Sequence, residues 1–185
     1  MILIGLTGTH GAGKGTVTNY LRRVHGFYCV SVSEFLAQEA VRRGMQPDRT
    51  ARRNIANEYR AQGATGLMEA VYATVPPDEM RVIIEPQYTL AEVAFVQEKG
   101  GVLFAVDADR KVRYNRVHVR GSAKDDVSFE EFCRAETKEM GSEDPEKQSL
   151  RATIAAADVL IENSGSVEEL EMAVQRILCE RFYIC

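Results

Sequence analysis

The chain opens with a short apolar run that breaks into a glycine-rich segment. Residues 2–7 are aliphatic apart from Gly5 and Thr7, and residues 8–16 then read Gly-Thr-His-Gly-Ala-Gly-Lys-Gly-Thr. A buried strand that turns through glycines and continues as a helix makes several backbone N–H groups converge on one point, which suits a polyphosphate. The segment therefore predicts a strand, a phosphate-binding loop and a helix, in that order.

The glycine-rich segment fits the phosphate-loop pattern of Gly, four residues and then Gly-Lys-Ser/Thr, with one difference. Gly8, Gly13 and Lys14 have the expected spacing, but Gly15 stands before Thr16. Lys14 is expected to follow the γ-phosphoryl group in catalysis, and the Thr16 hydroxyl to bind Mg²⁺. The backbone N–H groups around the β-phosphate belong to Gly11, Ala12, Gly13, Lys14 and Gly15. These residues predict a site for ATP with Mg²⁺, and the alternative is a glycine-rich turn without a ligand.

Length and composition predict a single domain over residues 1–185. Of its 185 residues, 45% are hydrophobic, which is enough for one well-buried core. The net charge of −4 provides no overall positive field for nucleic acid or anionic lipid. The opening apolar run is too short to span a membrane, and the 4 scattered cysteines are typical of thiols in a reducing compartment. We therefore expect a cytoplasmic monomer or homodimer that binds small-molecule nucleotides, without nucleic acid or membrane partners.

Strand-like and helix-like segments alternate along the whole chain. Apolar, β-branched runs predict strands at 2–7, 27–32, 81–85, 101–106 and 159–161. Helical periodicity predicts helices at about 14–25, 33–43, 48–62, 66–74, 129–140, 145–156 and 167–181, and further helices after Thr89 and after Asp109. Such alternation indicates the α/β class: a three-layer domain with a five-stranded parallel sheet and helices on both faces.

Two of the predicted helices carry arginines on one side. After Asp109, three of them lie within about 60° of one another at about 100° per residue: Arg113, Arg116 and Arg120. On the helix at 48–62, three others lie opposite its apolar side: Arg49, Arg53 and Arg60. A solvated basic face is the alternative for both helices.

Glu85 ends a strand of almost entirely apolar residues, as expected in the middle of a parallel sheet. In such sheets, ligands collect at the carboxyl ends of the strands. We therefore expect Glu85 to support the magnesium ion together with Thr16. An ordinary strand-end carboxylate is the alternative.

In these features the chain resembles the nucleoside-monophosphate kinase group of phosphate-loop proteins, in which adenylate kinases carry Gly-Lys-Gly-Thr. It is similar above all to small kinases related to adenylate kinase or dephospho-coenzyme A kinase, and the resemblance extends to residues 30–34, 106–109 and 157–166. It implies transfer of the γ-phosphoryl group of Mg-ATP to a nucleoside monophosphate or a similar small phosphorylated acceptor. It also implies a small acceptor-binding insert at about 34–74 and a short lid at about 120–145.

On the donor side, the resemblance assigns roles to a helix and to a turn. The catalytic lid arginines that close over the transferring group match Arg113 and Arg116, with Arg120 beside them in the nucleotide site. Arginine suits this role because its bidentate contacts with phosphate oxygens are strong. The turn beside the donor base matches Asn163 and Gly165, for which a plain turn is the alternative.

On the acceptor side, the resemblance assigns a catalytic carboxylate to Glu34, which would orient or deprotonate an acceptor hydroxyl. An exposed glutamate at the start of a helix is the alternative, since the helix dipole favours one there. From the turn after the third strand, Glu85 and Gln87 are expected to bind the acceptor as well.

Two arginines that usually hold the acceptor are absent, because the aligned positions carry Ala37 and Tyr88. Arg49, Arg53 and Arg60 are the natural replacements. We expect Arg53 and Arg60 to bind the acceptor, with Arg60 favoured, and solvated arginines are the alternative. Two other functions remain compatible with these residues. One is transfer to a ribose hydroxyl, as in dephospho-coenzyme A kinase, with Glu34 as the base. The other is a nucleotide-binding regulatory module that has lost transfer.

Overall fold

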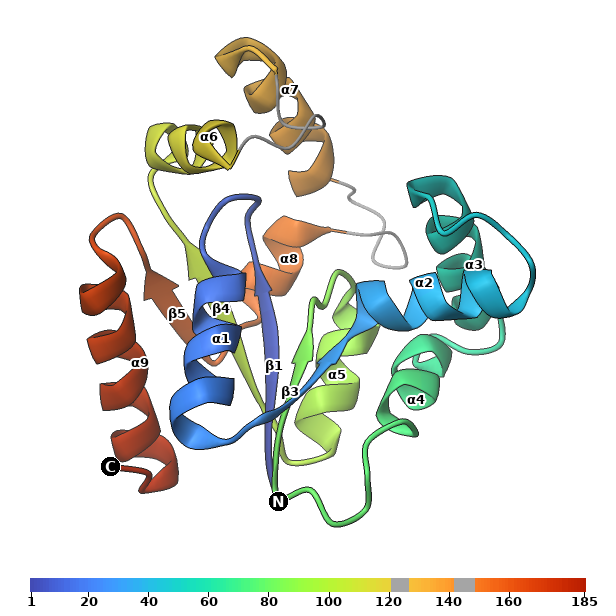
Figure 1. Ribbon diagram of the computed structural model, residues 1–185, viewed down its shortest axis with the longest axis horizontal. Helices are drawn as coiled ribbons and strands as arrows, with labels where there is room; N and C mark the ends of the chain where they lie inside the picture. The colour runs from blue at the N-terminus through green and yellow to red at the C-terminus, as the bar shows by residue number, and fades with distance from the viewer. Residues whose placement is uncertain (121–126, 142–148) are drawn as a thin grey trace.

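The apolar runs of the sequence pair as parallel strands in the computed structural model, which describes residues 1–120, 127–141 and 149–185. The strands are β1 (Ile2–Gly8), β2 (Tyr28–Ser31), β3 (Arg81–Glu85), β4 (Val102–Asp107) and β5 (Val159–Glu162). All pairings are parallel, and the spatial order is β2-β3-β1-β4-β5 (Figure 1). The predicted five-stranded parallel sheet is thereby confirmed.

Helices cover both faces of this sheet (Figure 1). They are α1 (Lys14–His25), α2 (Val32–Arg42), α3 (Arg49–Ala61), α4 (Gly66–Tyr72), α5 (Leu90–Glu98), α6 (Arg110–Val119), α7 (Phe129–Met140), α8 (Leu150–Ala155) and α9 (Val167–Phe182). Side chains along β1 alternate between two cores, as the pleat requires. Ile4 and Leu6 pack with α1 and α9, whereas Leu3 packs on the opposite face with α5.

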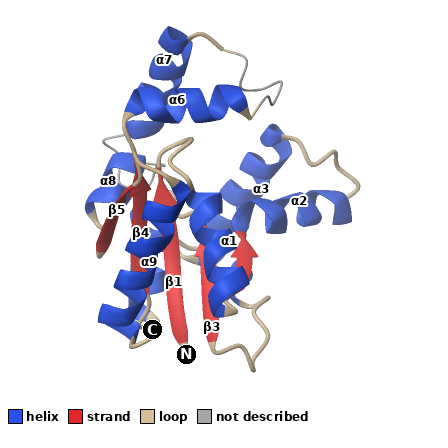
Figure 2. Cartoon of the chain, turned by 60° about the vertical axis from the view of Figure 1, so that its left-hand side comes forward, coloured by secondary structure: helices blue, strands red, loops and turns tan. Residues whose placement is uncertain are grey.

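The core on the α5 face continues outward into α2, α3 and α4. Leu36, Ile55 and Leu67 of these helices belong to the same buried cluster as Val82 and Ile84 of β3. The three helices therefore form an outgrowth fixed to the sheet by apolar packing. Figure 2 shows α6 and α7 above the carboxyl ends of the strands, with α2 and α3 to one side.

The predicted starts of two helices differ from the observed ones, and in each case a serine marks the observed start. Ser31, rather than Ser33, caps α2: its hydroxyl accepts a hydrogen bond of 3.3 Å from the backbone N–H of Glu34. The second strand consequently ends at Ser31 instead of residue 32. The helix expected from residue 145 is observed from Leu150, where Ser149 provides the cap.

Residues 121–126 and 142–148 lie outside the described residues, so of the predicted lid the structure describes residue 120 and residues 127–141, which include α7. In the described part of the chain, no helix has both the length and the apolar character that crossing a membrane requires.

Candidate functional site

The loop between β1 and α1 depends on glycine at three positions, which have positive φ values: Gly8 at 142°, Gly11 at 78° and Gly13 at 102°. A Cβ on Gly8 would lie 2.1 Å from the carbonyl oxygen of Val106, and one on Gly13 would lie 2.3 Å from Nδ2 of Asn163. A side chain fits at neither position. Gly15 differs, because a Cβ there would meet nothing within 4 Å. The first turn of α1 therefore faces open space on that side.

Lys14 and Thr16 belong to this first turn of α1. The Lys14 ammonium group donates to the carbonyl oxygens of Gly8 and Thr9, at 2.7 and 2.9 Å, which holds the charge over the loop. Thr16 is partly exposed at the same end of the helix. The loop, its lysine and its threonine thus lie together at the carboxyl end of β1, where a helix N-terminus favours anions.

A buried hydrogen bond fixes the loop to the neighbouring strand. The hydroxyl of Thr9, which is fully buried, donates to Oδ1 of Asp107 at 2.6 Å. The same carboxylate oxygen accepts from the backbone N–H of Ala108 at 2.9 Å. Neither Thr9 nor Asp107 is among the site residues predicted from the sequence. The sequence contains a signal for Asp107, because it directly follows the strand predicted at 101–106, at the end where ligands collect.

The turn after β5 supports the other side of the loop. Asn163, 5% exposed, donates from Nδ2 to the carbonyl oxygen of Ala12 at 2.7 Å. Arg116 donates to the carbonyl oxygens of Asn163 and Gly165, at 2.6 and 2.9 Å. The structure thus brings these predicted residues together at the loop, but Arg116 contacts the turn rather than pointing into open space above it.

The three arginines predicted on one face of α6 have different surroundings. Arg113 is 4% exposed and lies behind the loop, with Nε donating to the carbonyl oxygen of Ala108 at 2.8 Å. Arg116 lies on the turn after β5, and Arg120, which follows the last residue of α6, is exposed. This corrects the expectation that one lid face presents all three to the donor, because carboxylates and carbonyl groups hold the first two.

On the acceptor side, the structure brings Arg60 beside the turn that lacks the usual arginine. Arg60 donates from Nε and Nη2 to Oε1 of Glu92, at 3.1 and 2.6 Å. The other oxygen of Glu92, a residue 1% exposed, accepts from the backbone N–H groups of Tyr88 and Thr89 at 2.7 and 3.2 Å. Arg53 is exposed on the same helix as Arg60, nearly two turns away. Arg60 is therefore the arginine of this pair that is linked to the turn, through the carboxylate of Glu92.

The other predicted acceptor residues are separated. Glu34 is exposed in the first turn of α2, where Gln38 donates to its carboxylate at 3.5 Å. Glu85 is half-buried at the end of β3. Gln87, in contrast, is fully buried, and its Nε2 donates to the carbonyl oxygen of Ile84 at 2.9 Å. Its amide group thus stabilises the turn, and its contact with an acceptor stays a prediction.

Thr16 and Glu85 fit the magnesium ion that a phosphate loop implies. Both offer hard oxygen ligands, and Mg²⁺ is usually held by one or two protein groups together with substrate phosphates. Across residues 1–120, 127–141 and 149–185 there is no group of three His, Cys, Asp or Glu side chains that could hold a metal ion. A separate all-protein metal cage is thus absent from these residues.

A buried carboxylate joins the two long helices of the outgrowth. Glu39 of α2 is 7% exposed and accepts hydrogen bonds from Arg42 and Arg43, while Arg43 also pairs with Glu58 of α3. The hydrogen bonds from Arg42 and then Arg43 lower the pKa of Glu39 from 4.5 to about 2. Because the pKa is lower in the folded protein, these bonds stabilise the fold above about pH 4.5, and the stabilisation disappears as the pH falls toward 2.

We therefore expect Glu39→Gln to lower the free energy of unfolding at pH 7, and the difference from wild type to shrink as the pH falls from 4.5 to 2. Urea unfolding followed by circular dichroism at several pH values measures this difference. Glu98→Gln, which changes an exposed glutamate of α5, is the matched control. A wild-type advantage that is the same at every pH would contradict the assignment.

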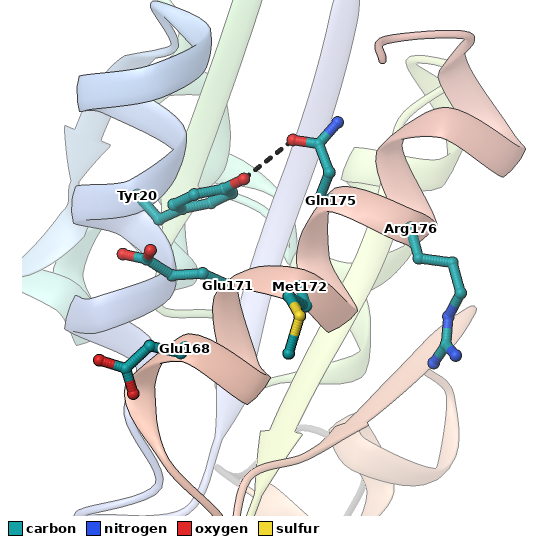
Figure 3. A pocket seen from close by; sticks show the side chains of 6 residues that line it. All are labelled: Tyr20, Glu168, Glu171, Met172, Gln175 and Arg176. Carbon is teal, nitrogen blue, oxygen red and sulfur yellow. Dashed lines mark hydrogen bonds between the residues drawn. The ribbon is translucent and has the colours of Figure 1, made fainter.

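A shallow hollow of about 440 Å³ lies between α1 and α9, outside the phosphate loop. Figure 3 shows its lining, with the hydroxyl of Tyr20 bonded to Oε1 of Gln175 at 2.8 Å. The other lining side chains are Glu168, Glu171, Met172 and Arg176 of α9. No residue predicted for the donor or the acceptor lines this hollow, so it plays no part in the candidate site.

Known proteins resemble this chain in sequence and in structure. A UPF0200 protein of Pyrobaculum aerophilum is 31% identical over 181 residues, covering 96% of this chain and 97% of its own length. A UPF0200 protein of Hyperthermus butylicus is 28% identical, with coverages of 96% and 93%. Among solved structures, dephospho-CoA kinase from Campylobacter jejuni has a TM-score of 0.59 at 13% identity, covering 97% of both chains. Shikimate kinase from Bacteroides thetaiotaomicron has a TM-score of 0.58 at 18% identity, covering 99% of both.

At these identities the structural likeness shows the fold alone, which is that of the small phosphate-loop kinases, as predicted. Residues 4–141, which include the loop, the outgrowth and α7, match the family model described as an AAA domain. The chain therefore belongs to the AAA-domain family of phosphate-loop proteins and, with its nearly full-length similarity, to the UPF0200 proteins.

Proposed function

We propose that this protein transfers the γ-phosphoryl group of Mg-ATP to a nucleoside monophosphate or a similar small phosphorylated acceptor. The observation that carries the proposal is the loop after β1, in which Gly8, Gly11 and Gly13 adopt positive φ and Lys14 lies over the loop carbonyls. Phosphoryl transfer requires mainly positioning and electrostatic stabilisation, which backbone N–H groups and a lysine supply.

In the donor site, the N–H groups at the start of α1 bind the β-phosphate, and Lys14 follows the transferring group. Thr16 and Glu85 hold the magnesium ion, which neutralises phosphate charge when it is bound. Asn163 and Thr9 keep the loop in shape through their hydrogen bonds to Ala12 and Asp107. The residues proposed here for the donor half thus belong to the start of α1 and to the ends of β1, β3, β4 and β5.

In the acceptor site, α2 to α4 form the insert at 34–74, and Arg60 takes the place of the arginine absent at Tyr88. Its guanidinium lies beside the turn because Glu92 holds it there. Arg53 and Glu34, both exposed, are available for further contacts with the acceptor. Arg120, at the start of the predicted lid, is exposed and is available to contact the donor nucleotide.

A second candidate is transfer to a hydroxyl group, with Glu34 as the base. The observation that favours it is the charge on the acceptor side. Glu92 neutralises Arg60, while Glu34 and Glu85 add negative charge near the ends of β2 and β3. Repulsion between like charges would weaken binding of a phosphate acceptor more than binding of a neutral hydroxyl. Two similar structures are named as kinases of shikimate and dephospho-CoA.

The experiment that tests the proposal offers Mg-ATP with a panel of nucleoside monophosphates, and in parallel with dephospho-CoA and other hydroxyl acceptors. Phosphorus NMR distinguishes a new phosphoanhydride from a new phosphate monoester. We expect ADP and a nucleoside diphosphate as products. A monoester product would establish the second candidate. Binding of ATP without transfer to any acceptor would contradict both, and would indicate a nucleotide-binding regulatory module.

A further inference from the structure

A buried ion pair joins helices α6 and α7 next to the phosphate loop. The guanidinium of Arg113 in α6 pairs through Nη1 with Oε1 of Glu136 in α7, and the two residues are 4% and 6% exposed. The other carboxylate oxygen of Glu136 lies 2.6 Å from Nε of Arg110, whose side chain is 53% exposed. Glu136 therefore has one buried partner and one partner at the surface.

The buried partner also contacts the loop. Nη1 of Arg113 donates to the carbonyl oxygen of His10 at 3.4 Å, and Nε lies 3.5 Å from Oδ1 of Asp107, the oxygen that accepts from Thr9. The backbones of the loop and of α6 are also close together. A Cβ placed on Gly11 of the loop would lie 2.7 Å from the carbonyl oxygen of Arg113. The loop thus rests directly on α6 at this arginine.

Helix α7 adds an aromatic contact on the same side. The ring of Phe132, 5% exposed, lies 5.9 Å from the guanidinium carbon of Arg113 and 6.3 Å from the ring of His10. Phe132 precedes Glu136 by one helical turn, so one side of α7 provides both the aromatic ring and the carboxylate. Arg113 is thus in contact with both the ring of Phe132 and the carboxylate of Glu136.

The surroundings of Arg113 favour a structural position over a contact with the transferring phosphate. A buried guanidinium is tolerated only where carboxylates and carbonyl groups compensate its charge, and here the buried carboxylate of Glu136 and the half-buried one of Asp107 lie beside it. The carbonyl groups of Ala108 and His10 accept from it as well. Movement of Arg113 toward a bound nucleotide would break this buried pair and leave Glu136 with its surface partner Arg110, which is unfavourable.

We propose that Glu136 is a positioning residue of the donor site, which holds Arg113 against the back of the phosphate loop. Arg113 is then a positioning residue too, and not the group that touches the γ-phosphoryl. Together they preorganise the loop N–H groups for the β-phosphate. The inference rests on the proposed function, because it requires a nucleotide donor at the loop.

The two roles predict different nucleotide selectivity. A residue that shapes the loop affects every ligand whose β-phosphate binds there, so ATP and ADP lose affinity by the same factor. A residue that touches the γ-phosphate affects ATP and leaves ADP almost unchanged. The ratio of the two dissociation constants therefore separates positioning from direct contact, and it requires no turnover.

The experiment measures binding of Mg-ATP and Mg-ADP to wild-type protein and to Glu136→Gln by isothermal titration calorimetry at fixed salt. We expect both dissociation constants to rise by about tenfold, a typical magnitude for coupling between linked sites, with an unchanged ratio. Arg110→Gln is the matched control: it removes the surface partner of Glu136 and leaves the buried pair intact. Its two affinities should equal those of wild type.

Several outcomes would overturn the inference. If Glu136→Gln weakens ATP alone, Arg113 touches the γ-phosphate; if it weakens neither nucleotide while its thermal melt remains cooperative, the ion pair only stabilises the fold. Should the glutamine variant fail to fold, Glu136→Asp retains the charge and undergoes the same test, with an equal loss for both nucleotides expected. If wild-type protein binds neither nucleotide, the proposed function itself fails, so the two failures remain distinguishable.

Discussion

Lys14→Ala lowers the rate of phosphoryl transfer by at least about 10³-fold, since catalytic cations in phosphoryl transfer contribute this much. The side chain contributes little to the fold: it is half-buried, belongs to neither core cluster, and bonds through Nζ to two loop carbonyls. To bind a phosphate, its ammonium group exchanges these carbonyls for phosphate oxygens. Single-turnover assays of ADP formation measure the rate, and circular dichroism with thermal melting measures the fold.

A matched control for this variant is Lys99→Ala. Lys99 is an exposed lysine after α5, and it lies over the rings of Tyr72 and Phe95 at 5.7 and 5.5 Å. Turnover should be unaffected there, because the residue lies far from the loop, toward the amino ends of the strands. If Lys14→Ala turned over at the wild-type rate, the loop would not be the donor site.

Gly8→Ala destabilises the protein by about 3 kcal/mol or more, the combined effect of backbone strain and overpacking. The residue has φ 142°, which L residues rarely adopt, and the new methyl group would lie 2.1 Å from the carbonyl oxygen of Val106. That oxygen cannot move away easily, because Val106 pairs with Gly8 between β1 and β4 in the centre of the sheet. Urea unfolding followed by circular dichroism measures the change in free energy.

Gly15→Ala is the control, since it makes the same chemical change on the other side of the loop. A Cβ there meets nothing within 4 Å, and the residue is already in the helix α1. Alanine favours a helix over glycine by about 1 kcal/mol, so stability should be unchanged or slightly higher. Equal destabilisation by both substitutions would contradict the described geometry of the loop.

The loop and the sheet could be predicted because their signals are local. An apolar run followed by glycines and a lysine specifies a strand, a turn and a helix without reference to the rest of the chain. Alternating strands and helices then restrict the sheet to parallel pairing. The capping box Thr89-x-x-Glu92, which begins α5, is a local signal of the same kind.

The roles of individual charged residues could not be predicted in the same way. Helical spacing placed Arg113 and Arg116 on one side of a helix, but it contained no information about the carboxylate or the turn that each would meet. Likewise, the polar side chain of Gln87 suggested a binding role, and its burial depends on the path of the chain from β3 back across β1. Each of these environments depends on segments distant in the sequence.

By itself, the sequence determined a phosphate-binding loop at the carboxyl end of a parallel α/β sheet, because hydrophobic periodicity and glycine conformation act within a few residues. Only the tertiary structure decided which charges meet: Arg60 with Glu92 beside the acceptor turn, and Arg113 with Glu136 behind the donor loop. The physical reason is that an ion pair requires two side chains within a few ångströms. For residues on different helices, that distance is set by how the helices pack on the sheet and on one another.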